Sequence, residues 1–248
     1  MYNLLISLGV AGLAFGIGAA MGQWVYGFAP AMLVLPVVYF LLARRTGQQL
    51  EVIMTRAGAE LQAGRLKPAR EIIETGYALG PWQFLITQQI HAQLGALEFM
   101  QRNYKQARPL LEKAWKRNWQ AQGMLGILDA RAGKHDEALV RLGKASLLAK
   151  REPLYWALTC WLLLDAKRVD EAQRKVVEGL ETVENSKSLK ELQTAIANDK
   201  LKRFRWDRAF GQTWYQFFPE QAQAQAQRGQ AANDPRMRNR KTFPQPRR

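Results

Sequence analysis

Hydrophobic residues fill the start of the chain in two long runs, and no Lys, Arg, Asp or Glu occurs before Arg44. The first run covers about residues 2–22 and the second about residues 24–43. Each has the length that a helix needs to cross the hydrocarbon core of a membrane. We therefore expect residues 1–45 to form a transmembrane helical hairpin.

Two further features of these runs fit a hairpin in a bilayer. Aromatic side chains of the kind that settle at membrane interfaces lie near the link between the runs, at Trp24, Tyr26 and Phe28. Small residues recur at roughly helical spacing in the first run, and they allow two membrane helices to pack closely. These residues are Gly9, Gly12, Gly16, Gly18 and Gly22.

Two other interpretations of the uncharged start fit less well. A cleaved signal peptide would carry a charged segment before its apolar core, and no second apolar run would follow at once. A hairpin buried in a soluble protein would rarely extend so far without a charge. The first charges, Arg44 and Arg45, follow the second run directly, and Arg56 comes soon after. By the positive-inside rule, both ends of the hairpin then face the cytoplasm, as expected for a protein of the bacterial inner membrane.

Beyond Leu50 the hydrophobic positions follow the spacing of alternating helices with short turns. Two segments, HAQLGALEFMQRNYKQARPLLEKA and GMLGILDARAGKHDEALVRLGKA, share Leu-Gly before the turn and alanines after it. One alanine in each of four units anchors the pattern at separations of 38, 31 and 34 residues, namely Ala69, Ala107, Ala138 and Ala172. This pattern resembles the tetratricopeptide repeat, whose period is 34 residues. The resemblance implies an all-α solenoid of stacked helix pairs.

The resemblance and the composition together divide the chain into four parts. Residues 1–45 form the membrane hairpin, and residues 46–184 form about four tetratricopeptide-like helix pairs. Residues 185–218 form a degenerate pair (about 187–198 and 200–217) that caps the stack, because terminal repeats are usually atypical. Residues 219–248 are rich in Gln, Pro and Arg and poor in aliphatic residues, so we expect a disordered basic tail.

In tetratricopeptide proteins the first helix of each unit lines a concave groove that binds a partner. Transferred by register, the resemblance implies a largely apolar groove in this chain, suited to an apolar or amphipathic helical segment of a partner protein. Two aromatic residues, Phe99 and Trp161, would be its anchors. The full set of expected groove residues is Gln89, Ala96, Phe99, Met100, Gln120, Ile127, Arg131, Leu154, Trp161 and Leu164.

The sequence contains no recognisable catalytic, metal or cofactor motif. Only His91, His135 and Cys160 supply nitrogen or sulfur ligands, fewer than the four or so that a structural zinc site takes. We interpret His91 as a core residue, His135 as a surface residue and Cys160 as a small buried hydrophobic residue. No phosphate-binding glycine loop or nucleophile elbow is present. We therefore predict a protein that is not an enzyme and holds no metal or cofactor.

The basic residues suggest contacts with anionic surfaces. The chain has a formal net charge of +15, all of it beyond residue 43. Residues 200–218 interleave Lys and Arg with aromatic residues, which would suit nucleic acid, but we favour a cap whose aromatics seal the last repeat. The tail would contact anionic membrane lipids through Arg228, Arg236, Arg238, Arg240, Lys241, Arg247 and Arg248.

Together these features predict a scaffold anchored in the inner membrane that holds a partner protein at the cytoplasmic membrane surface. It would serve as an assembly or accessory factor of an envelope or motility complex. Two alternatives stay open at this point. One is a membrane-tethered protein that binds nucleic acid, and the other is an accessory subunit that contacts a membrane complex through its spans.

Overall fold

The computed structural model of the protein describes residues 1–21, 24–145 and 149–233, with side chains as far as residue 226. Within these residues the chain forms α-helices, short 3₁₀-helices and turns, and no strand, which confirms the expected all-α class. The chain divides into two compact units. The first comprises residues 1–97 with 113–115, and the second comprises residues 98–112 with 116–248.

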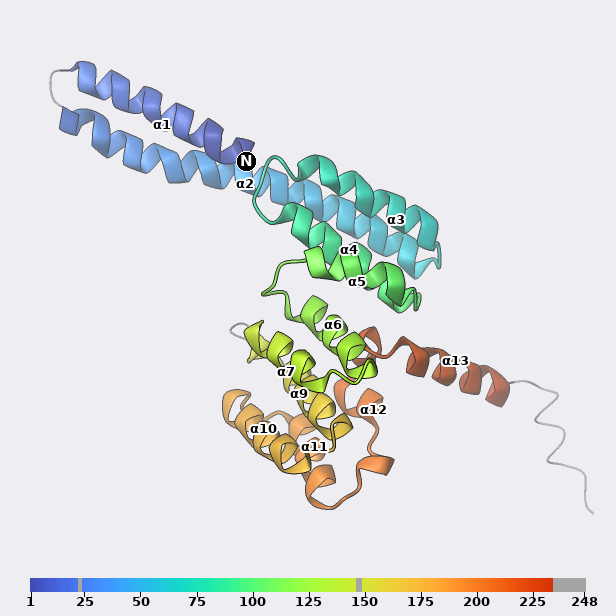
Figure 1. Ribbon diagram of the computed structural model, residues 1–248. Helices are drawn as coiled ribbons and strands as arrows, with labels where there is room; N and C mark the ends of the chain where they lie inside the picture. Colours follow the sequence, from blue (N-terminus) through green and yellow to red (C-terminus); the bar gives the residue numbers. More distant parts are fainter. Residues whose placement is uncertain (22–23, 146–148, 234–248) are drawn as a thin grey trace, which may run out of the picture. The chain divides into compact units, whose positions relative to one another are not determined.

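The first unit begins with the expected pair of apolar helices, α1 (Tyr2–Ala20) and α2 (Trp24–Gln62), which run antiparallel (Figure 1). They meet most closely where Gly18 faces Gly27. A Cβ atom on Gly18 would lie 2.3 Å from the carbonyl oxygen of Tyr26, so only glycine fits there. Of the five glycines that the sequence analysis named as allowing close helix packing, Gly18 makes such a contact. Gly9, Gly12 and Gly16 face open space, because one line of contact uses only one side of α1, and Gly22 lies outside the described residues.

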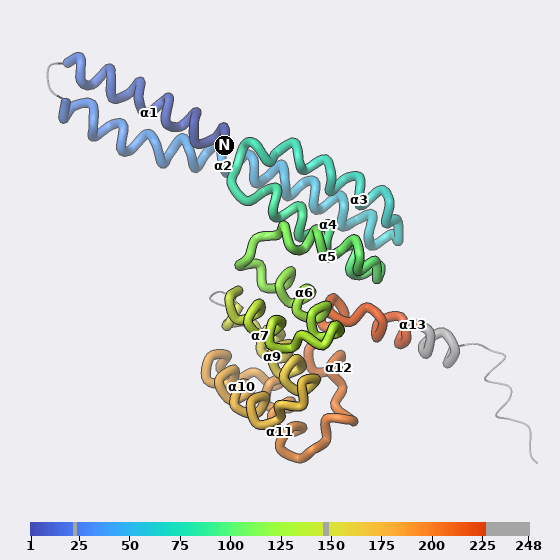
Figure 2. The backbone as a smooth tube through the Cα atoms, viewed as in Figure 1, coloured from blue at the N-terminus to red at the C-terminus, as the bar shows by residue number. Residues whose placement is uncertain are grey.

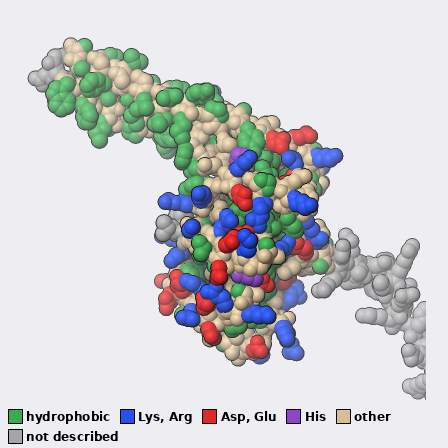
Figure 3. All heavy atoms as spheres, in the orientation of Figure 1, with side chains coloured by type: hydrophobic (Ala, Val, Ile, Leu, Met, Phe, Trp, Pro, Cys, Tyr) green, Lys and Arg blue, Asp and Glu red, His purple; other side chains and the backbone are tan. Residues whose placement is uncertain are grey.

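The large apolar side chains of the hairpin point outward. The side chains of Leu13, Ile17 and Leu33 are 70%, 71% and 71% exposed. Hydrophobic side chains cover the visible face of the hairpin in Figure 3. Helices that form the core of a soluble protein bury such residues. Both helices are also long and apolar enough to span a membrane.

A buried polar cluster closes the hairpin at the end opposite the α1–α2 link. The side-chain amide of Asn3 donates a hydrogen bond to the Thr46 hydroxyl at 3.0 Å, and the Ser7 hydroxyl donates to the Asn3 carbonyl oxygen at 2.7 Å. The Thr46 hydroxyl in turn donates to the Leu42 carbonyl oxygen at 2.9 Å. The start of α1 is therefore fixed beside the part of α2 that follows Arg44 and Arg45.

The second helix extends well past the expected end of its membrane run. We expected the span to stop near residue 43 and the repeats to begin at 46, but α2 is one helix of 39 residues (Figure 2). No proline interrupts it after Pro36, so nothing in the sequence ends it before Gln62. The second half of α2 forms the first helix pair with α3 (Leu66–Thr75), and η1 (Gly76–Leu79) follows.

The remaining helices alternate as the repeat pattern predicts. The anchor alanines Ala69, Ala107, Ala138 and Ala172 are all fully buried at 0% exposure, one in the second helix of each pair. A methyl group leaves room for a neighbouring helix to come close. The helices of the later pairs are α4 (Ile86–Met100), α5 (Tyr104–Lys113), α6 (Trp119–Arg131), α7 (His135–Lys144), α9 (Pro153–Asp165), α10 (Val169–Thr182) and α11 (Lys187–Ala197).

The turns between paired helices share one backbone geometry. Each has a residue with positive φ, and the next N–H donates to the carbonyl oxygen five residues before it, as Lys134 does to Asp129 at 2.9 Å. This bond satisfies a carbonyl at the end of the first helix. The residues with positive φ are Gly64, Arg102, Gly133 and Lys167, with φ from 61° to 77°. The turn of the fourth pair therefore forms without the glycine that the repeat normally supplies.

This geometry predicts that Lys167→Gly stabilises the protein. A left-handed backbone costs a non-glycine residue roughly 1–2 kcal/mol, and the added freedom of glycine in the unfolded chain offsets part of the gain. We expect the free energy of unfolding to rise by about 1 kcal/mol, measured by urea unfolding followed by circular dichroism. The matched control Gly133→Lys should lower it by a similar amount. Unchanged midpoints for both variants would contradict the argument.

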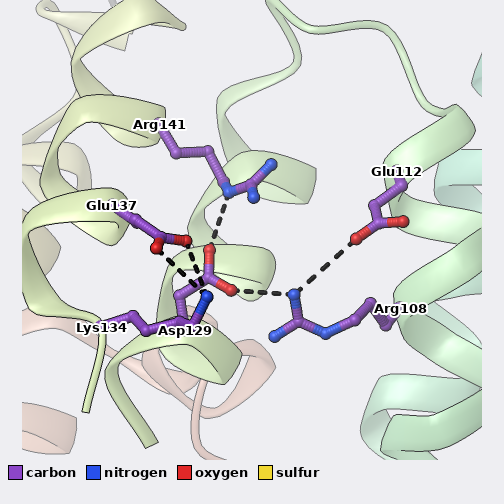
Figure 4. Close-up of polar contacts among 6 residues, drawn as sticks. All are labelled: Arg108, Glu112, Asp129, Lys134, Glu137 and Arg141. Atoms are coloured by element: carbon purple, nitrogen blue, oxygen red, sulfur yellow. Dashed lines mark hydrogen bonds and ion pairs between the residues drawn. The ribbon is translucent and has the colours of Figure 1, made fainter. Parts of the chain in front are cut away.

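An ion-pair cluster around one buried carboxylate joins neighbouring pairs in the second unit (Figure 4). The Asp129 carboxylate of α6, only 2% exposed, contacts Arg108 of α5 at 2.8 Å and Arg141 of α7 at 2.9 Å. Figure 4 shows Asp129 between the two arginines, with Glu112 on the far side of Arg108. Each oxygen of the buried carboxylate therefore has its own guanidinium partner, and one residue ties three helices together.

Removing both arginines should lower the free energy of unfolding far more than removing the exposed carboxylate of Glu112. We expect Arg108→Ala combined with Arg141→Ala to lower the free energy of unfolding by about 3–5 kcal/mol, because it leaves a buried carboxylate without a partner. Glu112→Ala is the matched control. Its contact with Arg108 is 3.7 Å long and half exposed, so we expect a change of at most about 0.5 kcal/mol. Equal melting temperatures for the double variant and the control would refute the role of the cluster.

The C-terminal region differs from the expected cap and tail. The first cap helix, α11, is present, but the second is replaced by three short elements: η2 (Leu201–Arg203), α12 (Trp206–Phe210) and η3 (Gln212–Gln216). The expectation of disorder from residue 219 is wrong for its first half, where α13 (Pro219–Asn233) forms. Its alanines and glutamines favour helix, and Pro219 occupies the first turn, where proline is tolerated.

Candidate partner-binding groove

Two neighbouring first helices of the second unit, α6 and α9, form the face that the repeat resemblance assigned to the groove. We call it the α6/α9 face. It is not empty. The chain's own residues 214–220, at the end of η3 and the start of α13, pack against it. Phe217 lies 5.8 Å from Trp119 of α6 between ring centroids. A Cβ atom on Gly123 of α6 would lie 2.8 Å from the Phe217 ring, so this position has to be glycine for the ring to fit.

Aromatic rings fix this segment to α9. Four rings follow one another, from Trp206 of α12 to Trp214 at 4.7 Å, then to Phe218 at 4.7 Å, and finally to Trp161 of α9 at 4.6 Å. Trp214 and Phe217 are fully buried and Phe218 nearly so. Close aromatic pairs stabilise a fold beyond the area that they bury. The aromatic residues that we expected to seal the last repeat therefore pack on one another and against the α6/α9 face.

An ionic contact completes the docking of α13. The carboxylate of Glu220 contacts the guanidinium of Arg131 at 2.9 Å and accepts a hydrogen bond from the Tyr104 hydroxyl. Arg131 also lies over the Tyr104 ring, 4.8 Å from its centroid. Burial works against the charge on Glu220, but the hydrogen bonds from Arg131 and Tyr104 outweigh it and lower the pKa of Glu220. Burial, followed by the hydrogen bond to Glu220, raises the pKa of Tyr104.

Several expected groove residues are not available to a partner. Phe99, the first expected anchor, is 0% exposed and packs against Tyr104 at 5.2 Å between ring centroids. Ile127 is also fully buried. Both side chains are buried, so the expectation that they line an accessible groove is wrong at these two positions. Trp161 and Arg131 do face the groove, but Phe218 and Glu220 of the same chain already contact them.

The other expected groove residues keep some exposure. Gln89, Gln120 and Met100 are exposed, and Ala96, Leu154 and Leu164 are partly buried. Gln120 and Leu154 lie together in an open cavity of about 400 Å³ beside the docked segment. Its wall is mixed: Trp119, Pro153 and Phe210 are apolar, whereas Glu152, Ser188, Thr213 and Gln216 are polar. This cavity is one part of the expected groove that residues 214–220 leave open.

Sequence reasoning missed the residues that fill the α6/α9 face, namely Phe217, Phe218 and Glu220, and their partner Tyr104. The first two were interpreted as parts of the cap, and Glu220 as the start of a disordered tail. A usable signal was the cluster of aromatic residues directly before Pro219-Glu220, because such a cluster at the end of a solenoid has no other apolar surface to cover.

The candidate reactive residues are accounted for by packing. Cys160 is fully buried, and burial raises the pKa of its thiol to about 12, which leaves it unreactive at neutral pH. His91 packs against Tyr77 at 5.4 Å, and burial together with the nearby Lys113 charge lowers its pKa. His135 contacts Asp165 at 2.9 Å on the surface. The described residues contain no cluster of ligands that could hold a metal ion.

The basic aromatic region does not present free rings for stacking on bases. Phe204 packs against Trp206 at 5.0 Å, and Trp206 stacks on Trp214. Asp207 binds Arg205 at 2.7 Å, and this contact lowers the pKa of Asp207 to about 2. Of the residues expected at an anionic surface, Arg228 lies in α13 but beyond the described side chains. The others, which are Arg236, Arg238, Arg240, Lys241, Arg247 and Arg248, lie outside the described residues.

These helix pairs and their shared face form a helical repeat. Residues 98–162 match the tetratricopeptide repeat family. The match runs from the end of α4 into α9 and includes α5, α6 and α7. A comparison with curated proteins finds no match for the chain.

The docking of α13 should depend on the charge of Glu220. We expect Glu220→Gln to lower the free energy of unfolding at pH 7 by about 1 kcal/mol, a value reduced because this carboxylate is partly exposed. The folded protein lowers the pKa of Glu220 from its ordinary 4.5. The stabilising effect is therefore complete above pH 4.5 and disappears as the pH falls through the lowered pKa. Urea unfolding at several pH values measures the difference.

The matched control is Glu181→Gln, which removes an exposed carboxylate from α10. It should change stability little at any pH. A deficit of Glu220→Gln that stays constant from pH 7 to below pH 4 would show that the charge of Glu220 is not what holds α13.

Proposed function

We propose that the protein is a membrane-anchored scaffold whose tetratricopeptide pairs hold a partner protein at the membrane surface. One observation carries this proposal. Two outward-facing apolar helices precede the helix pairs, α2 continues unbroken into the first pair, and residues 98–162 in the later pairs match a repeat family that binds proteins. The hairpin anchors the chain and the pairs supply the binding surface. No reacting group is needed for this role.

The orientation follows from the charges beside the hairpin. Arg44 and Arg45 are exposed on α2 directly after its apolar part, and the α1–α2 link is uncharged. The positive-inside rule then puts both ends of the hairpin, and the repeats, on the cytoplasmic side of a bacterial inner membrane. Anionic lipids of that leaflet would attract a domain with a net charge of +15. An assembly or accessory factor of an envelope complex fits this position.

The cavity at Gln120 and Leu154 is the surface that we propose for the partner. The bound segment 214–220 shows what the α6/α9 face accepts: aromatic rings on a short helical turn, followed by a carboxylate. The cavity continues this face and shares Trp119 with it. A partner would therefore present an apolar side of a helical segment to Leu154 and Phe210. A nucleic acid fits less well, because the aromatic rings of the basic region are packed on one another.

Affinity capture of the full chain tests the scaffold. The chain is expressed in a bacterium, cross-linked in the cells and purified in mild detergent, and the bound proteins are identified by mass spectrometry. We expect Leu154→Asp to reduce the recovered partner several-fold, since it puts a charge into an apolar contact. The control Val140→Asp changes an exposed valine of α7 that does not line the cavity, and it should recover as much partner as the parent.

Circular dichroism has to show the same helical content for both variants and the parent. Equal recovery from all three chains would place the partner elsewhere than the cavity. A chain that carries only the hairpin is purified in the same way for comparison. If the full chain recovers no protein in excess of this control, the scaffold function is contradicted.

A further inference from the structure

The loop between η1 and α4, residues 80–85, carries two large exposed aromatic side chains that the scaffold function does not use. Trp82 is 41% exposed and Phe84 is 59% exposed. Tyr2, at the start of α1, is 50% exposed, and its ring packs edge-on against Trp82 at 5.4 Å. Three aromatic residues from two distant parts of the first unit therefore gather at one place.

Backbone hydrogen bonds fix this loop to the start of α1. The Tyr2 N–H donates to the Pro81 carbonyl oxygen at 2.9 Å, and the Asn3 N–H donates to the Trp82 carbonyl oxygen at 3.2 Å. The first N–H groups of a helix have no partner inside the helix, and they need one where water is scarce. The loop supplies these partners, so its position along the hairpin is set by α1.

The depth of the loop follows from the hairpin. At 1.5 Å per residue, α1 is about 28 Å long, close to the roughly 30 Å of a hydrocarbon core. Tyr2 therefore lies at one edge of that core. Asn3 is hydrogen-bonded to Thr46, which directly follows Arg44 and Arg45, so this edge is the one beside the first charges. Trp82, held against Tyr2, lies at the level of the lipid headgroups.

The charge pattern around the loop removes the main obstacle to lipid contact. No Lys, Arg, Asp or Glu occurs between Glu74 and Glu98. Burying an unpaired charge at the edge of the hydrocarbon would be costly, and this loop has none to bury. Trp and Tyr are the residues that favour the interface, because their rings are apolar and carry a polar group.

From these observations we infer that the loop is a third membrane contact of the protein, with Trp82 and Phe84 inserted among the headgroups and upper acyl chains of the bilayer that the hairpin spans. The inference rests on the proposed membrane hairpin. It adds that the first helix pair is attached to the bilayer surface as well as tethered by α2. The occupant of this aromatic surface is lipid, because the surface is continuous with the end of the hairpin that lipid already surrounds.

The test places an environment-sensitive fluorophore, a nitrobenzoxadiazole label, on single cysteines of the full chain reconstituted in phospholipid nanodiscs. Phe84→Cys reports on the loop. Leu33→Cys, on the exposed apolar side of α2, reports on the hairpin, and Leu66→Cys, exposed at the start of α3, reports on the repeat surface. The parent chain should stay unlabelled, because Cys160 is fully buried.

We expect the Phe84→Cys label to emit at shorter wavelength than the Leu66→Cys label. Lipids with a nitroxide near the headgroup should quench it several-fold more than they quench Leu66→Cys, while aqueous iodide should quench it less. Leu33→Cys should be quenched best by lipids with the nitroxide near the bilayer centre. Circular dichroism confirms that each labelled chain keeps its helices.

The outcomes separate the two proposals. A Leu33→Cys label open to iodide would overturn the membrane hairpin, and the loop inference with it. A Leu33→Cys label inside the bilayer with a Phe84→Cys label open to iodide would overturn the loop inference alone. A Phe84→Cys label protected from both iodide and lipid quenchers would also overturn it, because protein rather than lipid would then cover the loop.

Discussion

The repeat region depends on a steric constraint: each pair has one place where the helices can meet only if a side chain is small. The four anchor alanines occupy these places and are completely buried. Glycine allows an equally close contact where a large aromatic ring lies opposite. A Cβ atom on Gly179 would lie 2.8 Å from the Trp156 ring, and one on Gly123 would meet Phe217. These contacts set the distances between the helices. The same distances allow Asp129 of α6 to contact both Arg108 of α5 and Arg141 of α7.

The chain covers part of the expected groove with its own residues. A solenoid ends with an apolar surface that has to be covered, and residues 214–220 cover it by packing back across α6 and α9. The contact between Glu220 and Arg131 attaches the start of α13 to the same surface. The cavity at Gln120 and Leu154, which we propose for a partner, is open beside this segment, so the segment that covers the core also borders the proposed binding site.

Local patterns in the sequence predicted the features that arise locally. Apolar runs gave the hairpin helices, and alanine spacing gave the helix pairs, because both depend on residues close together in the chain. The features that were missed depend on contacts between distant residues. Tyr104 meets Glu220 across more than a hundred residues. Phe99 is buried because its ring packs against the ring of Tyr104 in the second helix of the same pair. The continuation of α2 past residue 43 was missed for another reason, since a change in hydrophobicity was taken for a helix end.

The unbroken α2 also has a mechanical consequence. Proline is where a long helix bends most easily, and both prolines within α2, Pro30 and Pro36, lie in its apolar half. From Pro36 to Gln62 the helix has no such joint, so it behaves as a stiff lever arm. A membrane that becomes thinner or thicker changes the tilt of a spanning helix. In the proposed membrane-spanning arrangement, that change in tilt would rotate the first helix pair, because the same rigid helix α2 belongs to both the hairpin and the pair.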